Sequence, residues 1–316
     1  MYTFLVYPIN YISQSGEDEM KKTLLFGMLF TAIMTFGFYG CNNGNDATSD
    51  SAPAPTPADT ELTATLEKTG YTITYPKDLL ASITIDEENK TITFTPEAEK
   101  TEYTIKGTFD GQIINKTKNT VIILDNATLT NTEGAAAIYG ELKTEIKAAA
   151  NSENTISTTK KVDVKATVFC DKGLEIGGSG KLTITSENDK THAVKASKIE
   201  LKGSGIFTFD GGSDASAINC NEFSVDEGKT FTANLKDSKN GIKADKTIII
   251  ASGTFNFENL ATALKTDTSK DDKDGETVEH FIKLNGGNFT FTNCEKKVST
   301  EEGKFTKEDS VTGDFE

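Results

Sequence analysis

Apolar and polar residues alternate with a period of two over most of the chain, as in Leu174 and Ile176 or Ile248 and Ile250. This period indicates β-strands with one buried face, because successive side chains of a strand point to opposite sides. Helical repeats would place apolar residues at i, i+3 and i+4, whereas these segments are dense in threonine, isoleucine, phenylalanine and glycine. We therefore predict an all-β protein.

The pattern also repeats along the chain, with a period of about 24 residues. Each copy has an apolar anchor, one outward position, a small residue, a polar turn, a second strand, a glycine turn and a third strand. The anchors are 26, 24, 24 and 22 residues apart, at Val168, Val194, Ile218, Ile242 and Leu264. We predict a single parallel β-solenoid over residues 117–316, with about 24 residues and three strands per coil, preceded by an N-terminal β cap over residues 62–116.

Stacked coils would place equivalent residues about 4.8 Å apart along the axis. Cys170 and Cys220 occupy the same inward position two coils apart, which exceeds the Cα separation that a disulfide tolerates. We predict that both are free and buried. The same reasoning predicts one stack of aromatic rings, formed by Phe207, Phe231, Phe255 and Phe289.

Residues 20–40 are typical of a secretory signal, with a basic start at Lys21 and Lys22 and an apolar stretch that ends before Cys41. The last four residues resemble a bacterial lipobox, in which the signal is cut before the cysteine and the thiol is acylated. We predict lipidation of Cys41 and an exported protein anchored by lipid to the cell envelope, at the outer membrane or cell surface. An ordinary signal cut nearby and an uncleaved anchor are the alternatives.

The remaining N-terminal segments are interpreted from composition. Residues 1–19 precede the signal, and Gly16-Glu17-Asp18-Glu19 requires purine-rich codons like those of a ribosome-binding site, so we interpret them as a misassigned start. Residues 41–61 are rich in Asn, Ser, Pro, Ala and Thr and are predicted to form a flexible tether.

The charge balance excludes some classes of partner. The 48 acidic side chains outnumber the 33 basic ones, for a net charge of −15, so we predict no nucleic-acid partner. Every basic residue is lysine, and the chain also lacks tryptophan. We predict a monomer.

Four segments within residues 103–300 resemble a family of exported bacterial carbohydrate-binding proteins. They are Gly107–Gly111, Val121–Leu129 with Ala137-Ile138-Tyr139, Ser152–Ile156 and Asn240–Asp245. The resemblance implies a right-handed parallel β-helix of the pectate-lyase type, binding of cellulose or acidic pectate-type glycans, and bound calcium. The chain has Asn240 where family members commonly carry aspartate, which weakens the implied calcium binding.

The outward positions of the first strand suggest a binding surface for a polysaccharide. Aromatic residues at one end could contact sugar rings, and lysines further along could meet uronate carboxylates. A solvated face that keeps an acidic protein soluble is the alternative. The candidate carbohydrate-binding residues are Tyr139, Phe169, Lys195, Asn219, Lys243 and Lys265.

Asp245 and Asp267 fall at equivalent turn positions of consecutive coils, where their carboxylates could share a calcium ion. Turn capping by local hydrogen bonds is the alternative. The segment from Asp267 to Glu276 lacks the ligand spacing of an EF-hand and is predicted to be an exposed hairpin.

We predict no enzymatic activity. His192 and His280 have no recognisable nucleophile beside them, and no close cluster of aspartates recurs on the outward positions. A polysaccharide lyase is a rival function, but without arginine it would need a lysine of lowered pKa as its base. A cell-surface adhesin or structural lipoprotein with a protein partner is the other alternative.

Overall fold

The computed structural model describes residues 63–98, 100–118, 120–159, 161, 164–267, 270, 271 and 277–316. The predicted start, signal, lipidation site at Cys41 and tether therefore lie outside the described residues. No helix of the described part is long and apolar enough to cross a membrane.

The described chain begins with antiparallel pairs that cover one end of the core. β1 pairs antiparallel with β2, β3 with β4, and β2 with β5. Ser82 Oγ and Tyr103 OH, both buried, are hydrogen-bonded at 2.7 Å beneath this layer. The elements are β1 (Thr63–Lys68), β2 (Tyr71–Pro76), the 3-10 helix η1 (Lys77–Ser82), β3 (Ile83–Asp86), β4 (Thr91–Phe94) and β5 (Glu102–Asp110).

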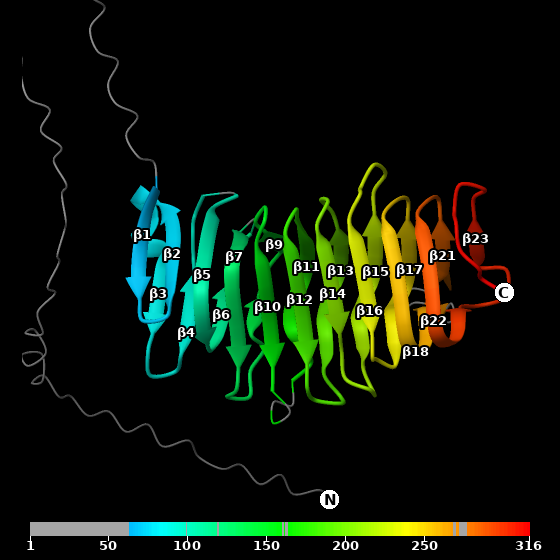
Figure 1. The fold of residues 1–316 in the computed structure, drawn as a ribbon, viewed down its shortest axis with the longest axis horizontal. Coiled ribbons are helices and arrows are strands. Elements are labelled where there is room, and N and C mark those ends of the chain that lie inside the picture. The colour runs from blue at the N-terminus through cyan, green and yellow to red at the C-terminus, as the bar shows by residue number, and fades with distance from the viewer. Residues whose placement is uncertain are drawn as a thin grey trace, which may run out of the picture. The chain divides into compact units, whose positions relative to one another are not determined.

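Parallel pairing begins where β4 meets β6 and β5 meets β7, and it continues to β23 (Figure 1). The parallel strands are β6 (Gln112–Asn115), β7 (Thr120–Asn131), β8 (Ile138–Gly140), β9 (Thr144–Ala148), β10 (Glu153–Thr158), β11 (Ala166–Gly178), β12 (Lys181–Ser186), β13 (His192–Leu201), β14 (Ile206–Asp210), β15 (Ser216–Val225), β16 (Thr232–Lys236), β17 (Asn240–Ile250), β18 (Thr254–Thr266), β21 (Phe281–Leu284), β22 (Asn288–Ser299) and β23 (Phe305–Lys307).

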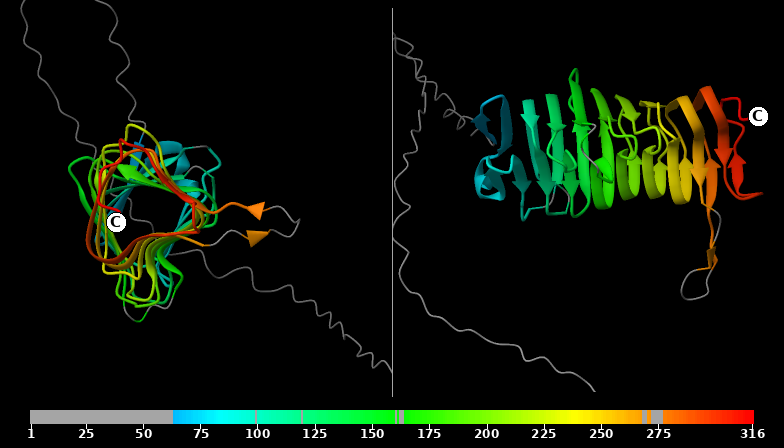
Figure 2. Two further views of the ribbon diagram at one scale, coloured as in Figure 1. Left: turned by 90° about the vertical axis from the view of Figure 1, so that its right-hand side faces the viewer. Right: turned by 90° about the horizontal axis from the view of Figure 1, so that it is seen from below.

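Two short strands lie apart from this sheet. β19 (Lys270–Asp271) and β20 (Thr277–Val278) pair antiparallel and project from the side of the body (Figure 2). The antiparallel pairing expected of a hairpin in this segment is confirmed, and its predicted tip lies outside the described residues.

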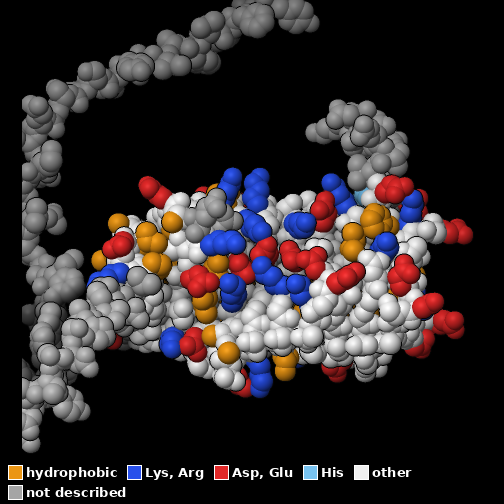
Figure 3. All heavy atoms as spheres, turned by 90° about the horizontal axis from the view of Figure 1, so that it is seen from above, with side chains coloured by type: hydrophobic (Ala, Val, Ile, Leu, Met, Phe, Trp, Pro, Cys, Tyr) orange, Lys and Arg blue, Asp and Glu red, His pale blue; other side chains and the backbone are white. Residues whose placement is uncertain are grey.

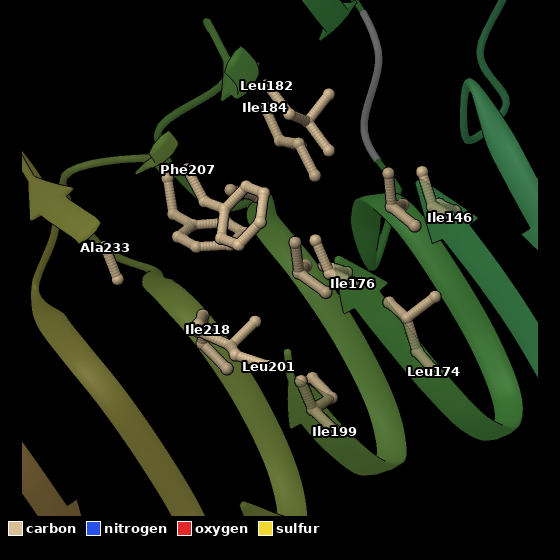
Figure 4. Packing of buried hydrophobic residues seen from close by; sticks show 14 of the residues in the cluster. Ile146, Leu174, Ile176, Leu182, Ile184, Ile199, Leu201, Phe207, Ile218 and Ala233 are labelled. Carbon is tan, nitrogen blue, oxygen red and sulfur yellow. The ribbon is translucent and has the colours of Figure 1, made fainter. Parts of the chain in front are cut away.

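The register between neighbouring circuits of the chain follows the apolar anchors. Val168 pairs with Val194, Val194 with Ile218, Ile218 with Ile242, and Ile242 with Leu264. All five side chains are fully buried. Figure 4 shows the inward side chains of successive strands packed against one another in the interior. The alternation of apolar residues therefore predicted which residues become neighbours.

The predicted fold class needs correction. The chain is all-β, but 21 strands of the described residues belong to one sheet that closes around the core like a barrel (Figure 2). Its typical circuit has two strands, since β11 pairs with β13 and β12 with β14. A right-handed parallel β-helix with three separate strands in every coil is therefore wrong. The physical reason lies at the corner after the first strand, where an irregularity of register such as that between Cys170 and Gly173 bends the strand without ending it. The circuit also varies, from 22 residues between Ile242 and Leu264 to 34 between Phe255 and Phe289.

The predicted aromatic stack forms, but one of its members, Phe231, is not in register with the others. Phe207 pairs in register with Ala233, and Ala233 pairs with Phe255, so the small alanine leaves room in the ladder. The ring of Phe231 fills that room, with centroids 5.8 Å from Phe207 and 5.6 Å from Phe255. Phe289 continues the stack at 5.3 Å from Phe255.

Cys170 and Cys220 are free and buried, as predicted. Ala196 lies between them in the ladder, paired with each. Burial raises the pKa of the Cys170 thiol to about 12, so it stays protonated at physiological pH. Both cysteines act as small apolar core residues.

Candidate functional site

The six predicted carbohydrate-binding residues lie in one row. They come from β8, β11, β13, β15, β17 and β18, and each pairs in register with the next. We call this row the outer ladder: Tyr139, Phe169, Lys195, Asn219, Lys243 and Lys265. The structure brings all six together, and their role in binding stays a prediction.

Two aromatic rings form one end of the outer ladder. The rings of Tyr139 and Phe169 are stacked, with centroids 5.7 Å apart and planes 19° apart. Both side chains are partly exposed. The ammonium group of Lys165 lies over the ring of Phe169, 4.7 Å from its centroid, in a cation–π contact. The stacked rings thus form a partly exposed apolar surface beside a lysine.

These rings line an open groove of about 580 Å³. We call it the aromatic groove, lined by Gln112, Ala135, Ala136, Tyr139, Val164, Lys165, Ala166, Phe169 and Lys190. Sequence reasoning missed Gln112, Lys165 and Lys190. The repeat could have indicated the two lysines. Lys165 and Lys190 come just before β11 and β13, whose first residues, Ala166 and His192, pair in register.

A hydrogen bond fixes the tyrosine ring of the groove. Tyr139 OH donates to Asp171 Oδ2 at 2.6 Å. This bond, more than partial burial, raises the pKa of Tyr139 to about 12. The phenol therefore stays protonated over the physiological range, and Asp171 holds the ring at the groove.

The middle of the outer ladder is already paired within the protein. Lys195 Nζ donates to Asn219 Oδ1 at 2.7 Å, and Asn219 is only 6% exposed. Burial, with the charges of Lys243 and Lys165 nearby, lowers the pKa of Lys195, although Asp245 opposes this. Lys195 is thus a half-buried donor with one hydrogen bond made, and differs from a freely solvated cation.

The two candidate calcium ligands flank a lysine. Lys243 Nζ lies 3.6 Å from an oxygen of Asp245 and 3.6 Å from an oxygen of Asp267. Calcium takes six to eight oxygen ligands, and within the described residues no group of three or more His, Cys, Asp or Glu side chains could hold a metal ion. The donor set fits the protein's own ammonium group better than calcium, and the calcium site stays a prediction.

A histidine lies behind the outer ladder at the start of β13. The backbone N–H of Ser216 donates to His192 Nδ1 at 2.8 Å, which requires that nitrogen to be unprotonated. Burial, together with the charges of Lys195 and Lys243, lowers the pKa of His192 from 6.5 to about 4. His192 is therefore neutral and structural at neutral pH.

This geometry predicts a loss of stability in acid. The unfolded histidine binds a proton below pH 6.5, whereas the folded one does so only near pH 4. The unfolded state therefore holds more protons in this window, and stability falls as the pH falls from 6.5 to 4. His192→Gln should show a flatter pH dependence of the urea midpoint in the same window. Parallel profiles for the two proteins would contradict this.

Comparisons with known proteins bear on the same region. Residues 87–197, about a third of the chain, match a family model described as "Carbohydrate-binding domain-containing protein". No curated protein matches the chain. One solved structure that does is the polysaccharide lyase-like protein from C. thermocellum, a gadolinium derivative, with 19% identity, 72% of this chain and 94% of that chain covered, and a TM-score of 0.43.

Proposed function

We propose that this protein binds a polysaccharide at the aromatic groove and the outer ladder and does not cleave it. The observation that carries the proposal is one of position: every residue that lines the aromatic groove lies within residues 87–197, the segment that matches the carbohydrate-binding model. On the sequence of residues 20–41 alone, we also propose an exported protein held at the cell envelope by a lipid on Cys41.

The chemistry of the groove suits a sugar chain. Aromatic side chains offer apolar contact to the C–H groups of a sugar, and the amide of Gln112 can hydrogen-bond to hydroxyls. Lys165 and Lys190 form no ion pair with a carboxylate of the described residues. Two uncompensated lysines favour an acidic, pectate-type glycan over neutral cellulose.

Twelve other lysines of the described residues are less available to a ligand because they form ion pairs. On the face in Figure 3, lysine and acidic side chains are interleaved, so the charges of many lysines are balanced locally. Lys202, for example, lies 3.0 Å from Glu145 and also pairs with Glu175. Within the described residues the groove lysines lack such pairing, as do others such as Lys198 and Lys283, and they differ from these in their position beside the aromatic rings.

The ion pairs also weigh against hydrolysis of a glycan by Glu145 and Glu175. Glu145 and Glu175 lie in register on β9 and β11. Burial acts to raise the pKa of Glu175, but hydrogen bonds from Lys143 and Lys202 outweigh it, and the pKa lies below its usual value. A glycosidase needs one carboxyl group that remains protonated, and Glu175 does not supply it.

A glycan array tests the proposed function. We expect the full-length protein to bind acidic plant polysaccharides, and Phe169→Ala to weaken that binding by about three- to tenfold through lost apolar contact. Ile206→Ala is the matched control, because Ile206 is 43% exposed on β14, outside the groove. An empty array would reject polysaccharide binding and favour a protein partner, and unsaturated product from polygalacturonate would reject the non-catalytic role.

A further inference from the structure

The outer ladder is a single row that runs along the body. In β8, β11 and β13, the ladder residue stands between two buried neighbours, as Tyr139 does between Ile138 and Gly140. The strands that carry the row follow one another along the long axis, as β11, β13, β15 and β17 do in Figure 1. A ligand that crosses the row meets one ladder side chain, whereas a ligand that follows it meets the five that are partly exposed.

The dimensions of the row suit an extended sugar chain. Neighbouring parallel strands are about 4.8 Å apart, so the five steps from Tyr139 to Lys265 span about 24 Å. A sugar ring of an extended, linear polysaccharide is comparable in length to this strand spacing. The row therefore offers a partly exposed side chain to each successive sugar except at Asn219, which is buried.

The charge along the row is uneven. Lys195 is hydrogen-bonded to Asn219, and Lys243 lies between Asp245 and Asp267, so the middle groups are paired within the protein and together carry no net charge. Lys265, at the far end, forms no ion pair with a carboxylate of the described residues. Hydroxyl groups suit the middle of the row, and carboxylates suit the aromatic groove and the far end.

Given the proposed function, we infer that a linear acidic polysaccharide lies along the long axis, with about six sugars over the outer ladder. One end of the bound stretch occupies the aromatic groove. Charged sugars meet Lys165, Lys190 and Lys265, and the hydroxyls of the sugars between them hydrogen-bond to the partly exposed, paired side chains of β13 and β17.

The test is a length series of galacturonate oligosaccharides, from two to eight sugars, titrated calorimetrically into the full-length protein. Affinity should rise by about tenfold between three and six sugars and then level off. Lys265→Gln should weaken binding of the six-sugar ligand by about threefold and leave the three-sugar ligand unchanged. Lys283→Gln, an exposed lysine on β21 away from the row, is the matched control and should change neither.

The outcomes separate this inference from the proposed function. Equal affinity for three and six sugars, or a six-sugar ligand insensitive to Lys265→Gln, would overturn the axial placement while leaving carbohydrate binding intact. Absence of binding for every length and for the polymer would reject both.

Discussion

Replacing Lys165 and Lys190 together with glutamine is expected to weaken binding of acidic polysaccharide by about tenfold or more. Each exposed lysine–carboxylate contact contributes up to about 1 kcal/mol, and 1.4 kcal/mol corresponds to a factor of ten. Glutamine keeps a polar, unbranched side chain, one bond shorter than that of lysine, while removing its charge. Affinity electrophoresis in gels containing polygalacturonate would measure the loss, which should shrink at high salt because screening weakens the native contacts.

The control for this pair is chosen to match its charge. Lys198→Gln with Lys283→Gln removes two exposed lysines from the second side of the circuit, so the net charge changes equally. This control should retain most of the affinity. Equal losses in the two double variants would mean that overall charge, and not the aromatic groove, determines binding.

A neutral ligand gives a second check. Binding of a cellulose-type oligosaccharide should depend on Phe169 and hardly on the two lysines, because it has no carboxylate for them to meet. If the lysine pair affected neutral and acidic ligands alike, the lysines would act by shaping the groove.

The row of site residues was predictable because its cause is local in sequence. Alternation puts Val168 and Cys170 inward and so puts Phe169 outward, and the repeat then aligns Phe169 with Lys195. A shift of one residue would expose the apolar side chains of a whole strand and bury its polar ones, so burial fixes this register strongly. The same local pattern placed Cys170 and Cys220 in the core.

The number of strands in a circuit was not predictable in the same way. The polar turn after Cys170 looks like a strand break in sequence, because it combines Asp171, Lys172 and Gly173. In the structure, β11 passes through this corner with a shift of register. Backbone hydrogen bonds to the neighbouring circuits keep the strand continuous, and these depend on residues far away in sequence.

The pairing of individual lysines also lay beyond the sequence. The outer ladder assigns the same type of position to Lys195, Lys243 and Lys265, but Lys195 meets Asn219 and Lys243 meets two aspartates. Lys165 lies outside the repeat position altogether and reaches the ring of Phe169 from the preceding loop. Side-chain conformation, not strand register, determines which lysines have a positive charge that no nearby carboxylate balances.

The largest expected effect on stability comes from Phe255→Ala. Phe255 is fully buried, and its ring contacts those of Phe231 and Phe289 in the adjacent circuits as well as Phe257 on its own strand. Truncating a buried phenylalanine to alanine costs about 3–5 kcal/mol, from lost apolar burial and the cavity left behind. Because stacked circuits stabilise their neighbours, the loss should weaken the packing on both sides of β18.

Urea denaturation followed by circular dichroism would measure this effect as a lower midpoint. Leu80→Ala is the matched control: Leu80 is 49% exposed in η1, and its truncation should change the stability by about 0.5 kcal/mol or less. Phe255→Leu should fall between the two, because leucine fills part of the cavity. A Phe255→Ala midpoint no lower than that of Leu80→Ala would contradict the stabilising contacts of Phe255 with the neighbouring circuits. The register of the outer ladder on β17 and β18 would then lack the support of this packing.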